Sequence, residues 1–453
     1  IITGSLFNGR VNTLALDAVN DTIYVGGYFN SVNGWAINRL AAINTNSGAL
    51  DPWRHGLAGG LNTSNYRPVH TLSLNPSNNE IYVGGDKIVR GVFRNRIAAL
   101  DVTTGQPTSW GDGLLTGPDD SISAIEAATN GTVYIAGSFS SVGGQNRVNL
   151  ASITSDGQVT SWNPIFPGVV KINDIELDEE NNTLYVGGNI GVSYRRTAYL
   201  ASINMTTSVV TPLSVNSTNP NPDVLSLALD SANDILYVGG NFYSLGGQSR
   251  HILGAINTNT GWATSWDPGM PPNSIDSRPA VYAVELSNDG TLHVGGSFSH
   301  SSGRTNLMSF ITSTGGVGGL NLYVDNTVYA LANDPTNNVM YVGGQFTSVG
   351  GQSREGLAAL NSVTGTLFPW NPILSIPILI KSARAIEVSA PPQTESAIPT
   401  TDGHPRANTA KMRTPRRKPA DESRNAFQQS FRRQYAASKQ SGQRIYPRSM
   451  AHA

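Results

Sequence analysis

Three glutamates hold the same place in three repeated segments and are the residues best suited to chemistry. They are Glu126, Glu176 and Glu285, each within an apolar segment whose alternation predicts a strand. Neighbouring side chains of a strand point to opposite faces, so we expect these carboxylates opposite the buried Leu and Ile side chains, toward a central channel. There they could bind a cation or serve as the acid and base of a glycoside hydrolase. The alternative is an ordinary wet channel wall that tolerates Glu.

Arginine recurs shortly before the third strand expected in every repeat. The seven positions are Arg39, Arg96, Arg147, Arg196, Arg250, Arg304 and Arg354. A ring of guanidinium groups would suit a polyanion, because arginine makes bidentate contacts with oxyanions. Recurrence in every repeat favours a structural role instead, with these groups bonded to backbone carbonyls or to an Asp of the adjacent turn.

The other chemistry-bearing residues match no known pattern of an active site. None of the seven histidines has the spacing of a metal site, and only His293 and His300 are close to each other. Without cysteine, a thiolate metal site and a cysteine nucleophile are impossible. The sequence also lacks a nucleophile elbow, a phosphate loop and a dinucleotide fingerprint. We therefore predict no enzymatic activity, no cofactor and no metal.

These residues belong to a unit that repeats seven times, at intervals of 48 to 58 residues. Its most regular mark is an apolar strand that ends in Gly-Gly, with Ala136 in place of the first Gly in the third copy. The copies are residues 23–27, 81–85, 133–137, 184–188, 236–240, 292–296 and 340–344. A period of this length is typical of a solenoid or a propeller. We interpret the glycines as the sharp exit from a strand.

One repeat has the strand content of one propeller blade. In the first copy we expect strands at residues 11–16, 22–27, 39–43 and 50–53, with an Asp- and Asn-rich turn at 17–21. The third strand, for example 40–43 (LAAI), is apolar on both faces and has small Ala, so it should lie between two stacked sheets. The fold class we predict is all-β: a seven-bladed β-propeller with four antiparallel strands in each blade.

Tryptophans at the end of the fourth strand are predicted to anchor the packing. They are Trp53, Trp110, Trp162, Trp266 and Trp370. The acidic turns could suggest calcium, but they lack the ligand spacing and the glycine of a calcium loop. We therefore expect them to be hairpin turns closed by Asn and Asp side chains.

The two ends of the array carry partial repeats. Residues 3–7 match 364–368 of the last copy, and residues 383–389 match 281–287, the first strand of the sixth. We therefore expect a propeller over residues 1–372, the first strand of an unfinished eighth repeat in 373–390, and a low-complexity tail over 391–453.

The charge of the chain is divided between the array and the tail. Residues 1–380 hold 16 Lys and Arg against 26 Asp and Glu, whereas residues 381–453 hold 14 against 5. The tail has few aliphatic residues, so we expect it to be disordered. It is either a native basic tail or unrelated sequence that follows a cut array. Its cluster 413–418 (RTPRRK) could attract nucleic acid, but an acidic, Gly-rich body does not fit a nucleic-acid reader.

Glycosylation sequons are consistent with a secretory route. They start at Asn20, Asn62, Asn130, Asn181, Asn204 and Asn216. No leader follows Ile1, and the longest apolar run, 373–380, is short and broken by Pro377, so we expect no transmembrane segment.

The repeat resembles a known class of propeller units. The segments 341–354 (YVGGQFTSVGGQSR), 357–360 (LAAL), 364–365 (TG) and 370–372 (WNP) are similar to delta-60 type repeats of secreted and surface proteins. They also resemble the propeller of fungal Rax-type cortical polarity markers, which are single-span surface glycoproteins. The resemblance covers about residues 1–390 and implies a fold without catalytic residues. Residues 86–92 and 189–193 depart from the pattern, so those units should present different loops.

These observations favour a non-catalytic module of an extracellular or cell-surface protein. We expect a monomeric propeller that binds a protein or a glycan through rim loops, in adhesion, polarity or a structural role, and that does not bind nucleic acid. One alternative is a polysaccharide-active enzyme that uses the channel glutamates. Another is an intracellular scaffold whose basic tail directs its location.

Overall fold

Strands form where apolar side chains alternate between turns rich in Asn, Asp and Gly. The computed structural model describes residues 7–370, except for 34, 52–67, 76–77, 87, 91, 95, 113, 115–116, 167–169, 194–195, 214–221, 272–278 and 321. All of these residues belong to one compact unit, residues 1–378. The predictions made for residues 373–453 lie outside the described residues.

The described residues contain seven antiparallel sheets of three or four strands. Sheet 1 contains β1 (Arg10–Asp17), β2 (Thr22–Tyr28) and β3 (Leu40–Asn44); sheet 2 contains β4 (Val69–Asn75), β5 (Glu80–Gly85) and β8 (Ile97–Asp101). Sheet 3 contains β9 (Ile122–Ala127), β10 (Val133–Gly137) and β13 (Leu150–Ile153); sheet 4 contains β14 (Val170–Asp178), β15 (Thr183–Ser193), β16 (Arg196–Asn204) and β17 (Val210–Pro212). Sheet 5 contains β18 (Asp223–Asp230), β19 (Ile235–Asn241) and β22 (Leu253–Asn257); sheet 6 contains β23 (Ala280–Leu286), β24 (Thr291–Ser299) and β25 (Thr305–Ile311). Sheet 7 contains β26 (Val328–Asp334), β27 (Val339–Gly344) and β30 (Leu357–Asn361).

Short hairpins follow the second strand of four sheets. They pair β6 (Ile88–Arg90) with β7 (Val92–Arg94), β11 (Ser141–Val142) with β12 (Gln145–Asn146), β20 (Ser244–Leu245) with β21 (Gln248–Ser249), and β28 (Ser348–Val349) with β29 (Gln352–Ser353). In sheet 4 the second and third strands are lengthened instead, which fits the departure predicted at 189–193. The only helical element in the described ranges is a 3-10 turn, η1 (Ser231–Asn233), so the predicted all-β class is confirmed.

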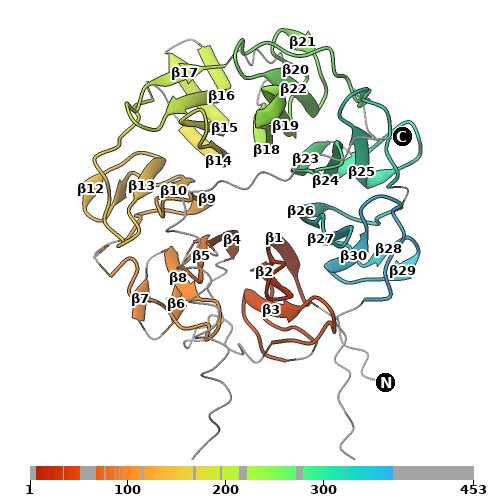
Figure 1. Ribbon diagram of the computed structural model, residues 1–453, viewed down its shortest axis with the longest axis horizontal. Coiled ribbons are helices and arrows are strands. Elements are labelled where there is room, and N and C mark those ends of the chain that lie inside the picture. Colours follow the sequence, from red (N-terminus) through yellow and green to blue (C-terminus); the bar gives the residue numbers. More distant parts are fainter. Residues whose placement is uncertain are drawn as a thin grey trace, which may run out of the picture. The chain divides into compact units, whose positions relative to one another are not determined.

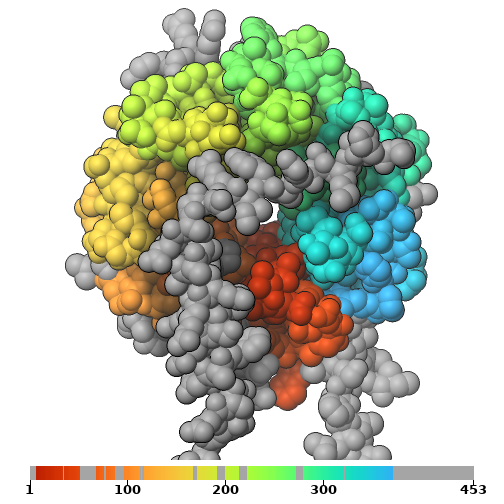
Figure 2. All heavy atoms as spheres, viewed as in Figure 1, coloured from red at the N-terminus to blue at the C-terminus, as the bar shows by residue number. Residues whose placement is uncertain are grey.

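The first strands of consecutive sheets lie side by side. Figure 1 shows them nearest the centre of this unit, in the order β1, β4, β9, β14, β18, β23 and β26. The order returns to its start, because β26 of the last sheet contacts β1 of the first. In the space-filling view of Figure 2, the red residues of sheet 1 meet the blue residues of sheet 7.

The apolar core is divided into layers between consecutive sheets. One cluster joins Ile23 and Val25 of sheet 1 to Tyr341 and Leu357 of sheet 7, and the other six junctions each have a cluster of their own. The Ala-rich third strands are buried within these layers, as the sequence predicts.

The first glycine of each Gly-Gly pair lets the next sheet approach closely. A Cβ on Gly239 would lie 2.5 Å from Val281 Cγ1 of sheet 6, and one on Gly343 would lie 2.6 Å from Val11 Cγ1 of sheet 1. A Cβ on the second glycine would clash with the first strand of the same sheet; at Gly240 it would lie 2.2 Å from the carbonyl oxygen of Asp223. The pairing of the two strands is irregular at this point, between Val224 and Ser226. Three of the second strands, β5, β10 and β27, end at the second glycine as predicted, and close packing is a further physical reason for the glycines.

Among the described residues, the fourth segment of the repeat forms a complete strand only in sheet 4, where β17 pairs with β16. In the other six sheets it makes one isolated bridge to the third strand. The bridges are Ile43↔Leu50, Leu100↔Pro107, Ile153↔Val159, Ile256↔Ala263, Phe310↔Val317 and Leu360↔Leu367. The expectation of four full strands in every repeat is corrected accordingly.

The tryptophans after the fourth segments of sheets 2, 3 and 5 tie each of these sheets to the next. Trp110, Trp162 and Trp266 are buried, and each packs edge to face against a tyrosine of its own sheet. Their Nε1 groups donate to backbone carbonyls of the following sheet at 3.1 to 3.2 Å. Trp370 packs against Tyr341, but its buried Nε1 has no partner among the described residues. Trp53 lies outside the described residues.

Candidate functional site

The three predicted glutamates lie on first strands, but two of them are engaged by the neighbouring sheet. Glu126 is on β9, Glu176 on β14 and Glu285 on β23. The Glu176 carboxylate accepts a hydrogen bond from the backbone N–H of Leu229 on β18. The Glu285 carboxylate accepts one from the backbone N–H of Asn333 on β26. Both side chains remain partly accessible and line the cavity between sheets 5 and 6.

Asp174 joins this group, and sequence reasoning did not select it. Its Oδ2 accepts from the backbone N–H of Leu227 at 2.8 Å, and its Oδ1 accepts from Ile175 N–H at 3.0 Å. It pairs in register with Gly187, a position that holds Thr, Ser or Ala in the other sheets. Asp174 is the one acidic residue at this position of the seven sheets, and this difference could have identified it from the sequence.

The four carboxyl groups hold their protons more tightly than usual. Desolvation by the surrounding protein is the main cause, and it raises the pKa of Glu126 to about 8 and the pKa values of Asp174 and Glu285 to about 7. The pKa of Glu176 is raised well above its usual value, first by desolvation and then by the charges of Glu126 and Asp174. Each side chain still keeps part of its surface accessible, because it stands at the inner edge of its sheet.

This group can act as a set of neutral acids near neutral pH. Their mutual effect on pKa shows that the four carboxyls share one electrostatic environment across sheets 3 to 6. Within the described ranges, no cluster of three or more His, Asp or Glu side chains has the geometry to hold a metal ion.

In the described part of the chain, three cavities lie between corresponding turns of consecutive sheets. We call the end of the sheets that carries these turns the turn face; it comprises residues 128–132, 178–182, 204–208, 230–234, 287–291, 311–315, 334–338 and 361–365. The turns of one sheet are held together, for example by Thr312 N–H, which donates to Gly290 O at 2.9 Å. The cavities measure about 490 Å³ between sheets 3 and 4, 580 Å³ between sheets 5 and 6, and 370 Å³ between sheets 6 and 7.

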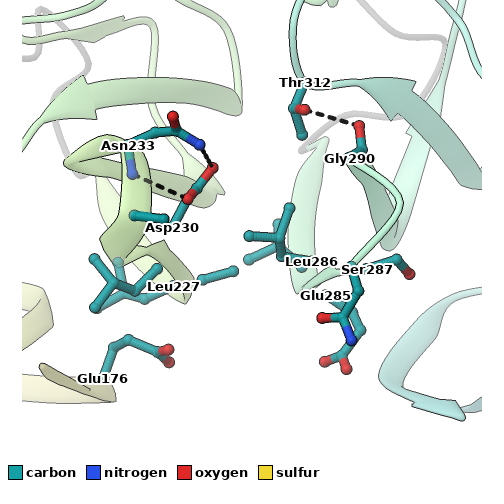
Figure 3. Close-up of a pocket in the computed structure, with 14 residues that line it drawn as sticks. Glu176, Leu227, Asp230, Asn233, Glu285, Leu286, Ser287, Gly290 and Thr312 are labelled. Atoms are coloured by element: carbon teal, nitrogen blue, oxygen red, sulfur yellow. Dashed lines mark hydrogen bonds between the residues drawn. The ribbon is translucent and has the colours of Figure 1, made fainter. Parts of the chain in front are cut away.

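The cavity between sheets 5 and 6 is mostly polar. Figure 3 shows Asp230 and Asn233 on one side, Gly290 and Thr312 on the other, and Glu176 and Glu285 at one end. Asn233 is fixed by its own turn, because its Nδ2 donates to Asp230 Oδ2 at 2.9 Å. The same Asp–Asn pair closes the turns at Asp17, Asp178 and Asp334. The predicted hairpin role of these acidic turns therefore agrees with the structure.

A small polar network occupies the junction of sheets 6 and 7. His293 is fully buried, and its Nε2 lies 3.0 Å from Ser287 Oγ. Asn333 Nδ2 donates to the same Oγ at 2.7 Å. Burial lowers the pKa of His293 to about 4, so its ring is neutral at physiological pH. His293 Nδ1 and Asn333 Oδ1 are buried without a hydrogen-bond partner in the described part of the chain.

The arginines support the sheets in the way that their recurrence suggests. Arg147, Arg250 and Arg354 lie three residues before the third strand and Arg304 lies directly before it; all four donate to carbonyls of the fourth segment. Arg39 and Arg96 lie directly before that strand, with positive φ of 64° and 67°, and Arg196 is the first residue of β16, so the seven arginines do not share one equivalent position. The side chain of Arg196 lies outside the described residues.

Two other histidines make local contacts. His70 lies 3.0 Å from Asp86, and His300 Nδ1 lies 2.9 Å from Ser302 Oγ. The structure does not bring His293 and His300 together as ligands, since they bond to different serines.

The sequons differ in the state of the amide nitrogen that would carry a glycan. Asn20 and Asn181 donate this nitrogen to Asp17 and Asp178 within their turns. Asn204 is partly buried and caps a turn, whereas Asn130 is exposed. Asn62 and Asn216 lie outside the described residues.

One comparison with known proteins gives a match. A profile described as "Domain of unknown function (DUF5122) beta-propeller" matches residues 128–159, which run from the turn before β10 to the bridge at Val159 in sheet 3. The chain carries a β-propeller repeat. No curated protein is significantly similar to it. In the described ranges, no helix has the length and apolar character needed to cross a membrane.

Proposed function

We propose that the chain is a seven-bladed β-propeller that binds a protein or a glycan at its turn face, without catalysis, as part of an extracellular or cell-surface protein. The observation that carries this proposal is the set of cavities between corresponding turns of consecutive sheets, two of which are mostly polar. Concave sites with a few fixed polar groups are where proteins usually bind small ligands or exposed side chains.

The seven blades rest on the order of the sheets. Each of the seven first strands contacts the next, β26 contacts β1, and seven apolar clusters fill the junctions. The matched DUF5122 segment supports a propeller repeat. The motifs at 341–354 and 370–372 further suggest delta-60 type repeats and a relation to Rax-type polarity markers.

Binding is favoured over polysaccharide cleavage by the hydrogen bonds of the carboxylates. Glu176 and Glu285 accept backbone N–H groups of the neighbouring first strands, which is the arrangement of structural acceptors. A glycosidase needs two carboxyl groups free to face the same glycosidic bond.

A glycan array and a partner pull-down with the full chain test the proposal. We expect a specific glycan or protein to bind, and we expect substitutions in the turns at 230–234 or 287–291 to weaken it. Absence of binding, together with turnover of a polysaccharide in a hydrolase assay that Glu126→Gln abolishes, would replace the proposal by the enzymatic alternative.

A further inference from the structure

We propose that Ser287 and Asn333, with the two cavities on either side of Ser287, form a binding site for the hydroxyl groups of a neutral saccharide, and that His293 positions Ser287. This inference rests on the proposed function, because it names the ligand class and the place on the turn face.

The first observation is that three departures from the repeat meet at one junction. The residue equivalent to His293 is a tyrosine in all six other sheets: Tyr24, Tyr82, Tyr134, Tyr185, Tyr237 and Tyr341. The residue equivalent to Asn333 is apolar in the other six: Leu16, Leu74, Ala127, Leu177, Leu229 and Leu286. Ser287 stands where four sheets have the turn-closing aspartate. Because the repeated residues are sufficient for the fold, departures that converge in space indicate a separate role.

The second observation is the geometry of these three side chains. Ser287 Oγ is held by His293 Nε2 at 3.0 Å from its own sheet and by Asn333 Nδ2 at 2.7 Å from the next sheet. Asn333 is fixed in turn by its backbone N–H, which donates to the Glu285 carboxylate. A hydroxyl held from both sides is preorganised, which lowers the entropy cost of binding.

The third observation is that two buried polar atoms of the network are unpaired. His293 has no exposed surface, and its Nδ1 has no partner in the described residues. Asn333 Oδ1 is likewise without a partner, and Asn333 lines the cavity between sheets 6 and 7. A buried polar atom without a partner is costly, so such atoms mark places that a ligand or a water molecule satisfies.

The cavities identify the ligand class. Ser287 and Asn288 line both the 580 Å³ cavity and the 370 Å³ cavity, so the two lie on either side of one turn. Hydroxyl and amide groups from Asn233, Thr312 and Ser362 can both donate to and accept from sugar hydroxyls. Asp230 and Asp289 disfavour an anionic ligand at the same place. A neutral oligosaccharide fits this lining best.

The test restores the repeat at this junction and measures saccharide binding. The triple variant Ser287→Asp, His293→Tyr and Asn333→Leu uses residues that already stand at the equivalent places of other sheets, so it is expected to fold. The matched control makes the opposite change at the junction of sheets 1 and 2, away from both cavities, with Tyr24→His and Leu74→Asn. Both are compared with the unchanged full chain on an array of neutral glucan, mannan, xylan and chitin oligosaccharides, followed by calorimetric titration.

We expect the unchanged chain and the control to bind the same oligosaccharide, and the triple variant to lose about tenfold or more in affinity, as for the loss of one or two hydrogen bonds. We also expect the ¹⁵N imidazole signals of His293, assigned with His293→Tyr, to shift during titration. Equal binding by the triple variant would overturn the site and leave the proposed function standing. A folded, unchanged chain that binds no oligosaccharide and shows no His293 shift would overturn the saccharide inference, while the protein pull-down would still test the broader function.

Discussion

At the scale of the residue, the carboxyl groups of sheets 3 to 6 show how the backbone N–H groups at the inner edge of a sheet find hydrogen-bond acceptors. The first strand of each sheet has an inner edge without a further strand, so its N–H groups need other partners. Asp174, Glu176 and Glu285 accept such N–H groups from the sheet that follows. Desolvation nevertheless dominates and raises the pKa of each carboxyl group.

The raised pKa values predict a specific dependence of stability on pH. The pKa of Glu126 rises from 4.5 to about 8 on folding, so the stability due to its neutral form is complete below pH 4.5 and is lost as pH rises through 8. We expect Glu126→Gln to match the unchanged chain at pH 5 and to be more stable at pH 9, by on the order of 1 kcal/mol or more. Urea unfolding at the two pH values measures this difference.

The stability of the variant must be compared with that of the unchanged chain at each pH, because the titration of His293 changes stability with pH in the opposite direction. Its pKa falls from 6.5 to about 4 on folding, so its stabilising contribution is present above pH 6.5 and is lost as pH falls through 4. Glu180→Gln, at an exposed glutamate, is the matched control and should show no such change between pH 5 and 9. If the stability of Glu126→Gln differed from that of the unchanged chain by the same amount at pH 5 and pH 9, the raised pKa of Glu126 would be contradicted.

A second residue-scale prediction concerns glycosylation. In a secretory host, we expect Asn130 to carry a glycan more completely than Asn20 or Asn181, because these two use the amide nitrogen to close their turns. Glycopeptide mapping of the secreted chain measures the occupancy. Higher occupancy at Asn20 than at Asn130 would show that the turns form after glycan transfer or do not limit it.

At the scale of the element, arginine side chains hold the fourth segment in place by hydrogen bonds that a complete fourth strand would otherwise make. In sheets 3 and 7 the fourth segment makes one bridge to the third strand. The buried guanidinium groups of Arg147 and Arg354 then bond the carbonyls of Thr160 and Phe368 in that segment. These contacts explain why a cation recurs in a chain with few charges.

We expect Arg354→Met to destabilise the chain by about 1.5–3 kcal/mol, because a charged group loses its bonds and the Phe368 carbonyl loses a donor. Urea unfolding measures the effect, and Lys171→Met, at an exposed lysine, is the control. A loss below 0.5 kcal/mol, the typical size for a surface substitution, would show that the fourth segment is held by other contacts.

The elements could be predicted from the sequence better than their partners. The strands that end in Gly-Gly, the Ala-rich strands and the Asp–Asn turns were all recognisable, because repeated local chemistry determines them. The role of the first glycine was not, since Gly239 meets Val281 of another sheet. The network of Ser287, His293 and Asn333 was also missed, because it depends on contacts across two sheets that no single repeat displays.

At the scale of the whole molecule, the decisive junction is the one between sheets 7 and 1. Gly343 lies against Val11, and Arg10 lies over the ring of Tyr329, 5.2 Å from its centre. Among the described residues, Trp370 Nε1 has no hydrogen-bond partner at this junction, unlike Nε1 of Trp110, Trp162 and Trp266 at theirs. A ring of the seven sheets would close at this junction.

An engineered disulfide tests this closure directly. A Cβ on Gly343 would lie 2.6 Å from Val11 Cγ1, which places the two Cβ atoms near the separation that a disulfide requires. The chain has no cysteine, so Val11→Cys with Gly343→Cys can form only one internal bond. We expect it to form in air, to increase mobility on a non-reducing gel and to raise the unfolding temperature, because it closes a very long loop of the unfolded chain. Val11→Cys with Gly187→Cys, which joins sheet 1 to sheet 4, is the matched control and should remain reduced. Equal crosslinking in both variants, or none in the first, would contradict a ring of seven blades that closes between β26 and β1.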